Sequence, residues 1–317
     1  MPILRLFRRN RGEPVTLRGG SDSYLLYPGD RRDTLKSAGE LGSTHIGYRV
    51  SDGAKVVVKR YHPHLSRLPT YADRIEREAE VTPRCTLLST ELIKQNGITC
   101  LVRDHLDGIS FRHLMQPRYR RKLSTAAYIT LFTAALEALE KVHRAGYIHC
   151  DIRPENIMVT RFNHRQPGKA AVHIIDFGLA RHPGELHDNP TDKLPFALFY
   201  GAPEQLLNFP SLTGFHTDVY AMAITLWEVM ACRRPWEEDI PPKVMHMQLT
   251  RPLPTDQRIP NGVFEVLSKA SSKAELPKPP HNYASNELRK LLTTTIQSRY
   301  PSANAMREAL IKNSSSE

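Results

Sequence analysis

Amphipathic segments with a helical period alternate along this chain with short apolar runs that polar turns separate. The clearest amphipathic segment covers residues 125–143 and stops before Gly146, a residue type that commonly terminates helices. Its apolar residues recur at intervals of three and four: Ile129, Phe132, Leu136, Leu139 and Val142. This spacing predicts a helix with one buried face.

A shorter and highly charged segment at residues 71–81 predicts a second helix. Apolar residues repeat there at helical spacing, and Pro83 is expected to end the helix because proline has no N–H to donate. On either side of this segment, residues 55–59 and 98–102 are rich in β-branched and apolar side chains. This composition predicts two strands.

Two further apolar runs, residues 157–159 and 172–175, also predict strands. As a hairpin they would bring Asn156 and Asp176 together at one end, with Asp151 a few residues away on the incoming loop. An amide and two carboxylates offer the hard oxygen ligands that Mg²⁺ prefers. The pattern therefore indicates a site for Mg²⁺ and a phosphate group.

The residues around this hairpin resemble the catalytic and metal-binding loops of the eukaryotic-type (Hanks-type) protein kinase family. In that family His-Arg-Asp is followed after four residues by Asn, and later by Asp-Phe-Gly. Residues 149–156 read His-Cys-Asp-Ile-Arg-Pro-Glu-Asn, and residues 176–178 read Asp-Phe-Gly. Residues 202–204 match the family's Ala-Pro-Glu.

This resemblance implies an α+β, bilobal protein-kinase-like fold. A small N-lobe at residues 31–104 would hold an antiparallel sheet and one helix, and a larger, mainly helical C-lobe would follow at residues 105–312. We expect a basic N-terminal tail and lead-in at residues 1–30 and a disordered C-terminal tail at residues 313–317.

The resemblance also assigns the residues that bind the phosphates of ATP. Gly39 and Gly42 occupy two of the three glycine places of the family's Gly-rich loop, whose backbone N–H groups approach the phosphates closely. Lys59 would hold the α- and β-phosphates, and Glu78 from the charged helix would pair with that lysine.

Three more residues are assigned to the nucleotide pocket in the same way. Val57 stands where the family has Ala against the adenine, Asp104 lies in the hinge between the lobes, and Met158 follows the catalytic loop. Arg103 would stand at the rear of the pocket. A buried guanidinium there needs an acidic partner such as Glu78, unless the alignment is offset by one residue.

The family pattern implies the catalytic roles as well. Asp151 would accept the proton of the acceptor hydroxyl, and Arg153 would steady the transferring phosphate. Asn156 and Asp176 would hold Mg²⁺ or Mn²⁺, which bridges the phosphates of ATP.

Three residues outside these motifs are expected to support the site. Asp218 would brace the backbone of the catalytic loop. Glu204 would form a buried ion pair with Arg299.

The chain departs from the family pattern inside the catalytic loop. Cys150 replaces the Arg that normally receives an activation-loop phosphate, so we expect a non-RD kinase that does not require loop phosphorylation. Arg153 replaces the usual Lys and keeps the positive charge in a different shape. Thr191 is the only Ser or Thr between Gly178 and Glu204.

Net charge adds an expectation about partners. Lys and Arg exceed Asp and Glu by 44 − 33 = 11, which favours ATP and acidic protein substrates. Residues 112–122 contain five Lys or Arg residues and no acid, which indicates either a solvated face or a docking site for an acidic substrate or an anionic lipid. The basic residues 1–11 are either a disordered tail or one of three functional segments, namely a transit peptide, a membrane-surface anchor or a docking arm.

The four cysteines are scattered, and no Cys-x-x-Cys occurs, which favours free thiols in a reducing compartment. The first residues lack the apolar core of a secretory signal, and the most apolar stretch, residues 220–232, is too short to span a bilayer. We therefore expect a cytoplasmic protein. The sequence leaves its oligomeric state open.

The leading hypothesis is ATP- and Mg-dependent phosphoryl transfer to a protein hydroxyl, with Ser or Thr as the acceptor. Cys150, Arg103 and the incomplete Gly-rich loop favour an alternative, a pseudokinase scaffold that binds partners. The long interval before Asp176 favours another, a small-molecule kinase of the antibiotic- or sugar-phosphorylating type. A nucleic-acid-binding module would explain the net charge alone, so no specific nucleic acid is predicted as a partner.

Overall fold

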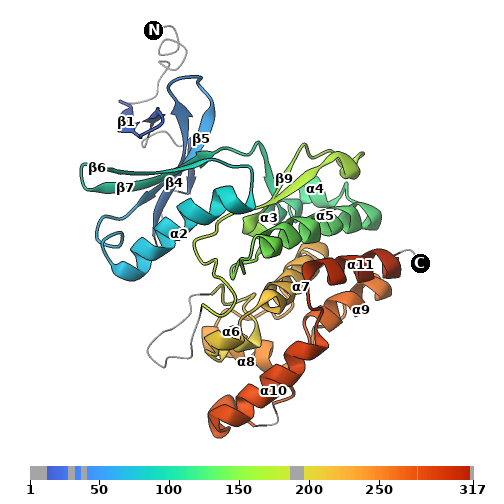
Figure 1. Ribbon diagram of the computed structural model, residues 1–317. Coiled ribbons are helices and arrows are strands. Elements are labelled where there is room, and N and C mark those ends of the chain that lie inside the picture. Colours follow the sequence, from blue (N-terminus) through green and yellow to red (C-terminus); the bar gives the residue numbers. More distant parts are fainter. Residues whose placement is uncertain (1–12, 28–32, 37–40, 186–195, 277, 315–317) are drawn as a thin grey trace. The chain divides into compact units, whose positions relative to one another are not determined.

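A computed structural model describes residues 13–27, 33–36, 41–185, 196–276 and 278–314. The chain divides into two compact units between Leu106 and Asp107, two residues beyond the boundary expected from the sequence. In its described part the first unit is an antiparallel sheet with one helix, and the second unit is mainly helical (Figure 1). The predicted α+β organisation is confirmed.

The first unit contributes a sheet with the strand order β1-β2-β4-β5-β7-β6, and β3 pairs with β4 beside this path. Its elements are β1 (Val15–Arg18), β2 (Ser23–Leu26), β3 (Thr34–Lys36), β4 (Gly42–Arg49), β5 (Lys55–Tyr61), α2 (Pro69–Cys85), β6 (Thr90–Gln95) and β7 (Ile98–Asp104).

Residues 15–26, which the sequence assigns to a tail and lead-in, instead form β1 and β2 of this sheet. β2 pairs with β4, and Leu17, Tyr24 and Leu26 are buried in the core of the unit. The other members of that core are Val56, Val58, Ile93, Cys100 and Val102. Each strand of the hairpin is only four residues long, so its alternation of buried and exposed residues is too short to be recognised in the sequence.

Side chains join the two ends of the sheet, β1 and β6. Gln95 Oε1 accepts a hydrogen bond from Arg18 N at 2.9 Å, and Gln95 Nε2 donates one to Thr16 O at 3.1 Å. These bonds satisfy main-chain groups of β1 that an edge strand would leave to water or to another chain. The sheet therefore curves around its apolar core.

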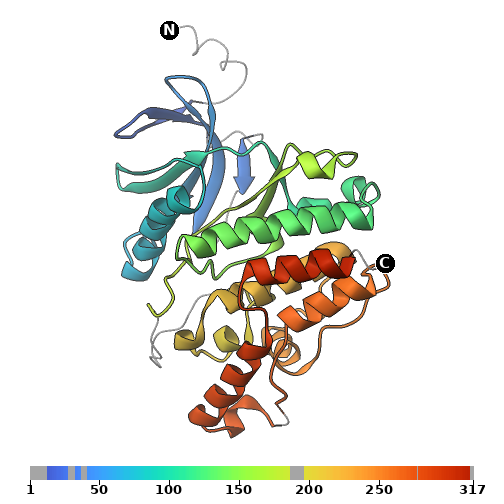
Figure 2. The same cartoon turned by 45° about the vertical axis from the view of Figure 1, so that its right-hand side comes forward.

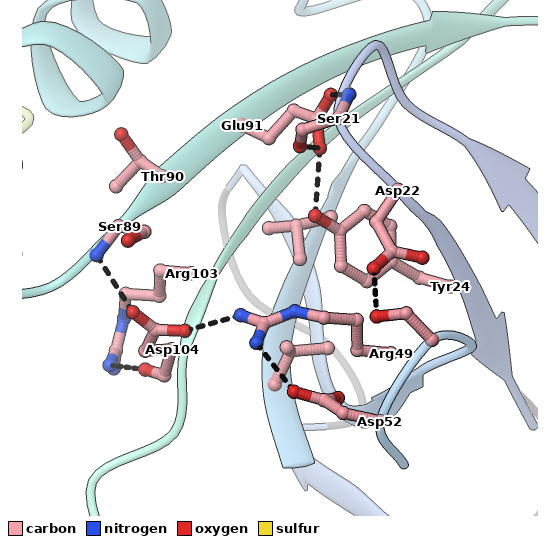
Figure 3. A pocket seen from close by; sticks show the side chains of 13 residues that line it. Ser21, Asp22, Tyr24, Arg49, Asp52, Ser89, Thr90, Glu91, Arg103 and Asp104 are labelled. Atoms are coloured by element: carbon pink, nitrogen blue, oxygen red, sulfur yellow. Dashed lines mark hydrogen bonds and ion pairs between the residues drawn. The ribbon is translucent and has the colours of Figure 1, made fainter. Parts of the chain in front are cut away.

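The carboxylate of Glu91 on β6 anchors the turn between β1 and β2 (Figure 3). It accepts hydrogen bonds from Gly20 N, from Ser21 N and Oγ at 3.1 and 2.8 Å, and from Tyr24 OH at 2.7 Å. A Cβ at Gly19 would meet this carboxylate, so a larger residue there would displace the Glu91 side chain from its present position. Burial raises the pKa of Glu91, but the hydrogen bonds from Tyr24 and Ser21 outweigh it and lower the pKa below 4.5.

Helix α2 continues past Pro83 to Cys85, so the expectation that Pro83 ends the helix is wrong. A proline leaves the carbonyl four residues earlier without its helical donor. Here that carbonyl, Ala79 O, accepts a hydrogen bond from Thr90 Oγ1 at 2.6 Å. The replacement donor comes from β6, so the sequence of the helix alone could not predict it.

The second unit places a three-stranded sheet, in the order β10-β9-β8, beside a set of helices. Its strands are β8 (Gly108–Ser110), β9 (Ile157–Thr160) and β10 (Ala171–Ile174). Its helices are α3 (Phe111–Leu114), α4 (Pro117–Arg120), α5 (Thr125–Arg144), α6 (Pro203–Leu206), α7 (Phe215–Ala231), α8 (Pro241–Thr250), α9 (Asn261–Ala270), α10 (Ser285–Ser298) and α11 (Ala303–Ser314). Short 3-10 turns are η1 (Pro154–Asn156), η2 (Pro167–Lys169), η3 (Pro210–Leu212) and η4 (Pro280–Asn282).

Helix α7 is the centre of this unit, since every residue from Thr217 to Ala231 is buried. Helix α5 matches the helix predicted at residues 125–143, and α11 lies alongside it (Figure 2). Because α11 continues to Ser314, the first two residues of the predicted C-terminal tail belong to a helix. Within the described ranges, no helix has both the length and the apolar character that a membrane span requires.

The predicted ion pair between Glu204 and Arg299 is confirmed, and neither side chain is exposed. Arg299 Nη1 donates to the two carboxylate oxygens at 2.9 and 3.1 Å, and Arg299 Nε donates to Ser272 O at 2.9 Å. Thr217 Oγ1 adds a third hydrogen bond to Glu204, also at 2.9 Å. This pair joins the start of α6 to the end of α10.

We expect Arg299→Ala to destabilise the protein by about 3–5 kcal/mol, because it leaves the carboxylate of Glu204 buried without its cation. The midpoint of urea denaturation measures this loss. Lys290→Ala, at an exposed position of α10, is the control and should change stability by less than about 0.5 kcal/mol. An Arg299→Ala protein with the wild-type midpoint would contradict the prediction.

Glu91→Gln should destabilise the first unit by about 1–3 kcal/mol at neutral pH, because a charged acceptor of several hydrogen bonds is lost. A carboxylate with a lowered pKa contributes stability above its unfolded pKa, and this contribution disappears as the pH falls through its folded pKa. The difference between the wild type and the variant should therefore be constant near neutrality and shrink below pH 4.5.

Urea denaturation at a series of pH values measures this difference for Glu91→Gln. Glu76→Gln is the matched control, because the Glu76–Lys94 pair is exposed and contributes little. A difference that does not depend on pH would show that the charge of Glu91 has no role.

Candidate active site

The first unit contains the predicted pair of Lys59 and Glu78. Lys59 on β5 places its Nζ 2.6 Å from Glu78 Oε1, and the Glu78 side chain on α2 is only 4% exposed. Tyr61 OH donates to the other carboxylate oxygen of Glu78 at 3.4 Å. The predicted pairing is confirmed, and it holds the ammonium group of Lys59 at the sheet.

The glycine and valine assigned to the nucleotide have clear structural surroundings. A Cβ on Gly42, whose φ is +152°, would collide with Arg60 O, so close strand pairing alone requires glycine there. Val57 is buried against Tyr27, Ile46 and Tyr48. Gly39 lies outside the described residues.

The hinge residue Asp104 is held within the first unit by its side chain and its main chain (Figure 3). Its carboxylate accepts from Arg49 Nη2 at 2.7 Å and from Ser89 N at 2.8 Å. Arg103 is half-buried, and its Nη1 donates to Asp104 O at 3.1 Å. The strand register places Arg103 opposite Val57. Glu78, the acid suggested as a partner for Arg103, forms its ion pair with Lys59.

The second unit brings the three predicted polar residues of the catalytic and metal-binding loops together. β9 and β10 pair antiparallel with Ile157 opposite Ile174, so Asn156 and Asp176 lie at the same end of the hairpin, as predicted. Ile175 N donates to Asn156 O at 3.0 Å, which fastens the two strand ends to each other. Met158 lies half-buried on β9.

The side chain of Asn156 is oriented by Asp151. Asn156 Nδ2 donates to Asp151 O and to Asp151 Oδ2, both at 2.9 Å. With the amide nitrogen committed to Asp151, the carbonyl oxygen of the amide faces away from it. Asp151 and Asn156 thus form a hydrogen-bonded pair, in which Asp151 Oδ1 and the amide oxygen of Asn156 are not used by the bond between them.

Asp218 on α7 holds the backbone of this loop, as predicted. Its carboxylate accepts from His149 N at 2.7 Å and from Cys150 N at 2.9 Å, and His143 Nε2 lies 3.0 Å from it. Asp218 itself is fully buried. Cys150 adopts a φ of +64°, a left-handed conformation that is uncommon outside glycine.

His149 links the catalytic loop to the segment that carries Asp176. Its Nε2 donates to Ile175 O at 3.1 Å, and its Nδ1 accepts from Asp151 N at 3.2 Å. Its ring meets the buried ring of Phe177 edge-on, with centroids 5.0 Å apart. These contacts place Asp176, which has a φ of +71°, beside the loop.

The pKa of Asp151 is raised above its ordinary value of 3.8. Burial is the main cause, and the negative charge of Asp176 is the second. A carboxylate with a raised pKa is a better proton acceptor than an ordinary one.

A family model described as the protein kinase domain matches residues 37–311. The chain belongs to this family. The predicted membership of the protein kinases, and with it the assignment to this class of phosphotransferases, is confirmed.

The relatives of this kinase domain include bacterial proteins. It is 26% identical to "Serine/threonine-protein kinase Pkn1" of Myxococcus xanthus over 78% of this chain and 35% of that protein. It is also 26% identical to "Probable serine/threonine-protein kinase pknA2" of Bifidobacterium longum, over 67% of this chain and 27% of that protein. The chain thus spans about a third of the length of these relatives.

A solved structure shares the fold of this kinase domain. The kinase domain of Mycobacterium tuberculosis PknI aligns with a TM-score of 0.60 and 21% identity, over 94% of this chain and 98% of that one. The predicted bilobal kinase fold is therefore confirmed.

Cys150 lies in an apolar environment in this kinase domain. It is buried with Ile148 and Leu179, and Phe215 packs against them. Burial raises the pKa of its thiol well above the usual value. The Cys150 side chain therefore offers a phosphate neither a cation nor a thiolate, and the positive charge that acts on it comes from Arg181.

Arg153 takes part in a charged cluster that the sequence does not reveal. Its Nε donates to Glu155 at 2.9 Å, and Glu155 also accepts from Arg112 Nε at 2.8 Å. Arg112 continues to Glu228 at 2.6 Å and to Tyr200 OH at 2.8 Å. Arg112 therefore does not belong to the exposed face that its neighbours in the sequence suggest. A glutamate inside the apolar helix α7 is the one sequence signal for such a partner.

The donor set of the second unit fits a magnesium ion bound between protein and phosphate. Among the described residues, no three His, Cys, Asp or Glu side chains form a metal cluster. Mg²⁺ needs no such cluster, since it is commonly bound by one or two protein oxygens together with phosphates and water. The amide oxygen of Asn156 and the carboxylate of Asp176 are oxygens of this kind.

We expect Asp218→Asn to release the catalytic loop from α7. The amide group would turn an N–H toward a backbone N–H, so either His149 N or Cys150 N would lose its acceptor, at a cost of about 1–3 kcal/mol. Hydrogen exchange of these two amides should become faster. In Asp239→Asn, a control at a position whose side chain is 94% exposed, it should not change. Wild-type protection in Asp218→Asn would refute the bracing role.

Proposed function

We propose that this kinase domain transfers the γ-phosphoryl group of ATP to a Ser or Thr hydroxyl of a protein. The observation that carries the proposal is the geometry of Asp151, whose carboxylate is oriented by Asn156 on a loop that Asp218 holds in place. The names of the bacterial relatives, serine/threonine-protein kinases, support the choice of acceptor.

Asp151 is the proposed acceptor of the hydroxyl proton. Its raised pKa favours uptake of that proton as the oxygen attacks the phosphorus. The contact with Asn156 Nδ2 leaves the other carboxylate oxygen, Oδ1, to face the incoming hydroxyl. Little covalent chemistry falls to the protein, so its contribution is position and charge.

Asn156 and Asp176 are the proposed ligands of Mg²⁺, or of Mn²⁺ in its place. When bound, the ion supplies positive charge against the phosphate oxygens of ATP. Asp176 lies half-buried at the end of the hairpin, and the bond of Asn156 Nδ2 to Asp151 O fixes the orientation of the Asn156 amide.

Lys59 is the proposed partner of the α- and β-phosphates. Glu78 neutralises and orients its ammonium group in the first unit, at a distance of 2.6 Å. Gly42, Val57, Asp104 and Met158 complete the proposed nucleotide contacts, together with Gly39 outside the described residues.

Activity without loop phosphorylation is part of the proposal. The apolar cluster around Cys150 supports it, because a phosphorylated loop would find no charged partner at that residue. Thr191, the one candidate acceptor in the activation segment, lies outside the described residues.

An acidic substrate and a cytoplasmic location are proposed as well. Arg118, Arg120, Arg121 and Lys122 are all exposed, which supports an acidic partner. The four cysteines are free thiols, which supports a reducing compartment. Contact of the basic N-terminus with a membrane concerns residues outside the described ranges.

A pseudokinase scaffold is the second candidate, and the burial of Val57 favours it. With Tyr27, Ile46 and Tyr48 covering it, Val57 is only 2% exposed where the adenine should pack. The pseudokinase hypothesis would be supported if the domain bound no ATP, or bound ATP without transferring phosphate.

We expect Asp151→Ala and Asp176→Ala to lower phosphoryl transfer by at least about 100-fold, since one loses the proton acceptor and the other a metal ligand. Transfer of radiolabelled phosphate from ATP to lysate proteins measures this loss. Asp151→Ala should still bind ATP with Mg²⁺ in calorimetry.

Asp239→Ala is the control for these variants, because its exposed carboxylate lies outside the proposed site. Undiminished transfer by either Asp151→Ala or Asp176→Ala would overturn the proposed function. Wild-type protein that binds ATP but transfers no phosphate would establish the pseudokinase instead.

A further inference from the structure

We infer that Arg112 is a positioning residue for the transfer step: it fixes Glu155, and through Glu155 it sets the position of the Arg153 guanidinium within the catalytic loop. The inference rests on the proposed phosphoryl transfer. It deepens that proposal by adding a residue from α3 that neither motif contains.

Arg112 uses every nitrogen of its guanidinium in contacts within the second unit. Nε donates to Glu155 Oε1 at 2.8 Å, Nη1 to Glu228 Oε1 at 2.6 Å, and Nη2 to Tyr200 OH at 2.8 Å. The planar fork of an arginine suits such a set of acceptors, which an ammonium group could not span. The orientation of Arg112 is therefore determined by three separate segments of the chain.

The buried carboxylate of Glu228 is the reason why Arg112 is held in this orientation. Its side chain is 2% exposed on the buried part of helix α7, and a charge so placed needs donors and a counter-ion. Tyr200 OH donates to Glu228 Oε2 at 2.6 Å, and Arg112 supplies the positive charge. Arg112 is thus held from the side of α7, independently of any substrate.

Glu155 connects Arg112 to Arg153 by hydrogen bonds from its two carboxylate oxygens. One of its oxygens accepts from Arg112 Nε, and the other accepts from Arg153 Nε at 2.9 Å. Burial raises the pKa of Glu155, but the hydrogen bonds and charges of Arg153 and Arg112 outweigh it and lower the pKa to about 2. The carboxylate therefore stays ionised and shared between the two arginines at any ordinary pH.

Arg153 is left with its terminal nitrogens available. Within the part of the chain that the structure describes, its one hydrogen bond is the bond from Nε to Glu155, and its guanidinium lies 5.9 Å from the ring centre of Tyr200. Two N–H₂ groups remain for an anion near Asp151, two residues earlier. Within the cluster, the charges of Arg112 and Arg153 balance those of Glu155 and Glu228.

The direct test follows the Arg153 Nε–H group by NMR of arginine side chains. In the wild type this proton should exchange slowly with water because it is bound to Glu155. Arg112→Ala should speed the exchange by roughly tenfold, since Glu155 loses its anchor. Arg118→Ala, which removes an exposed arginine of α4, is the matched control and should leave the exchange unchanged. Unchanged exchange in Arg112→Ala would overturn the inference.

A kinetic double-mutant cycle tests the consequence for transfer. Arg112→Ala should lower kcat by roughly tenfold with the KM for ATP unchanged, because the reacting phosphate loses an aligned cation. In the background of Arg153→Ala the same change should have no further effect. Additive losses would show that Arg112 acts only on general stability and would overturn the inference.

Two provisions keep these outcomes distinct. If Arg112→Ala does not fold, the double variant Arg112→Ala/Glu228→Gln takes its place in the NMR comparison, because it also removes the buried negative charge of Glu228. If the wild type transfers no phosphate, the proposed function fails, while the exchange of Arg153 Nε–H still decides whether Arg112 sets the position of Arg153.

Discussion

A single carboxylate shielded from water, that of Asp218, determines the geometry of the catalytic loop. On the buried helix α7 it is costly unless donors surround it, and the nearest donors are the backbone N–H groups of His149 and Cys150. To supply both, the loop places Cys150 in the left-handed region. Asp151 then follows with its carboxylate toward Asn156, so the position of the proposed base is a consequence of charge burial on another element.

Other buried acids connect distant segments by the same rule. Glu204 and Arg299 join the start of α6 to the end of α10, and Glu78 joins α2 to Lys59 on β5. In each case one partner is nearly inaccessible to water, so the pair specifies which segments meet even where its net contribution to stability is small. Arg112 likewise pairs with the buried Glu228, and through Glu155 it also contacts the catalytic loop.

The departures from the kinase pattern also have physical meaning in the structure. The buried, uncharged side chain of Cys150 stands where the family has an anion-binding arginine, which supports the proposed activity without a loop phosphate. Gly42 is explained by close strand pairing before any phosphate is considered. The burial of Val57 is the feature that bears most directly on whether ATP enters, because adenine would need the surface that aromatic residues cover.

The sequence by itself determined the elements and contacts that local spacing encodes: helix α5, the β9–β10 hairpin and the pairs implied by family motifs, such as Lys59 with Glu78. Only the tertiary structure decided what depends on residues far apart in the chain. The hydroxyl of Thr90 allows α2 to continue past Pro83, and Glu91 with its partners adds residues 15–26 to the sheet. The partners of Arg112 are up to 116 positions away, and neither periodicity nor charge density along the chain reports such a distance, because buried charges are matched in space.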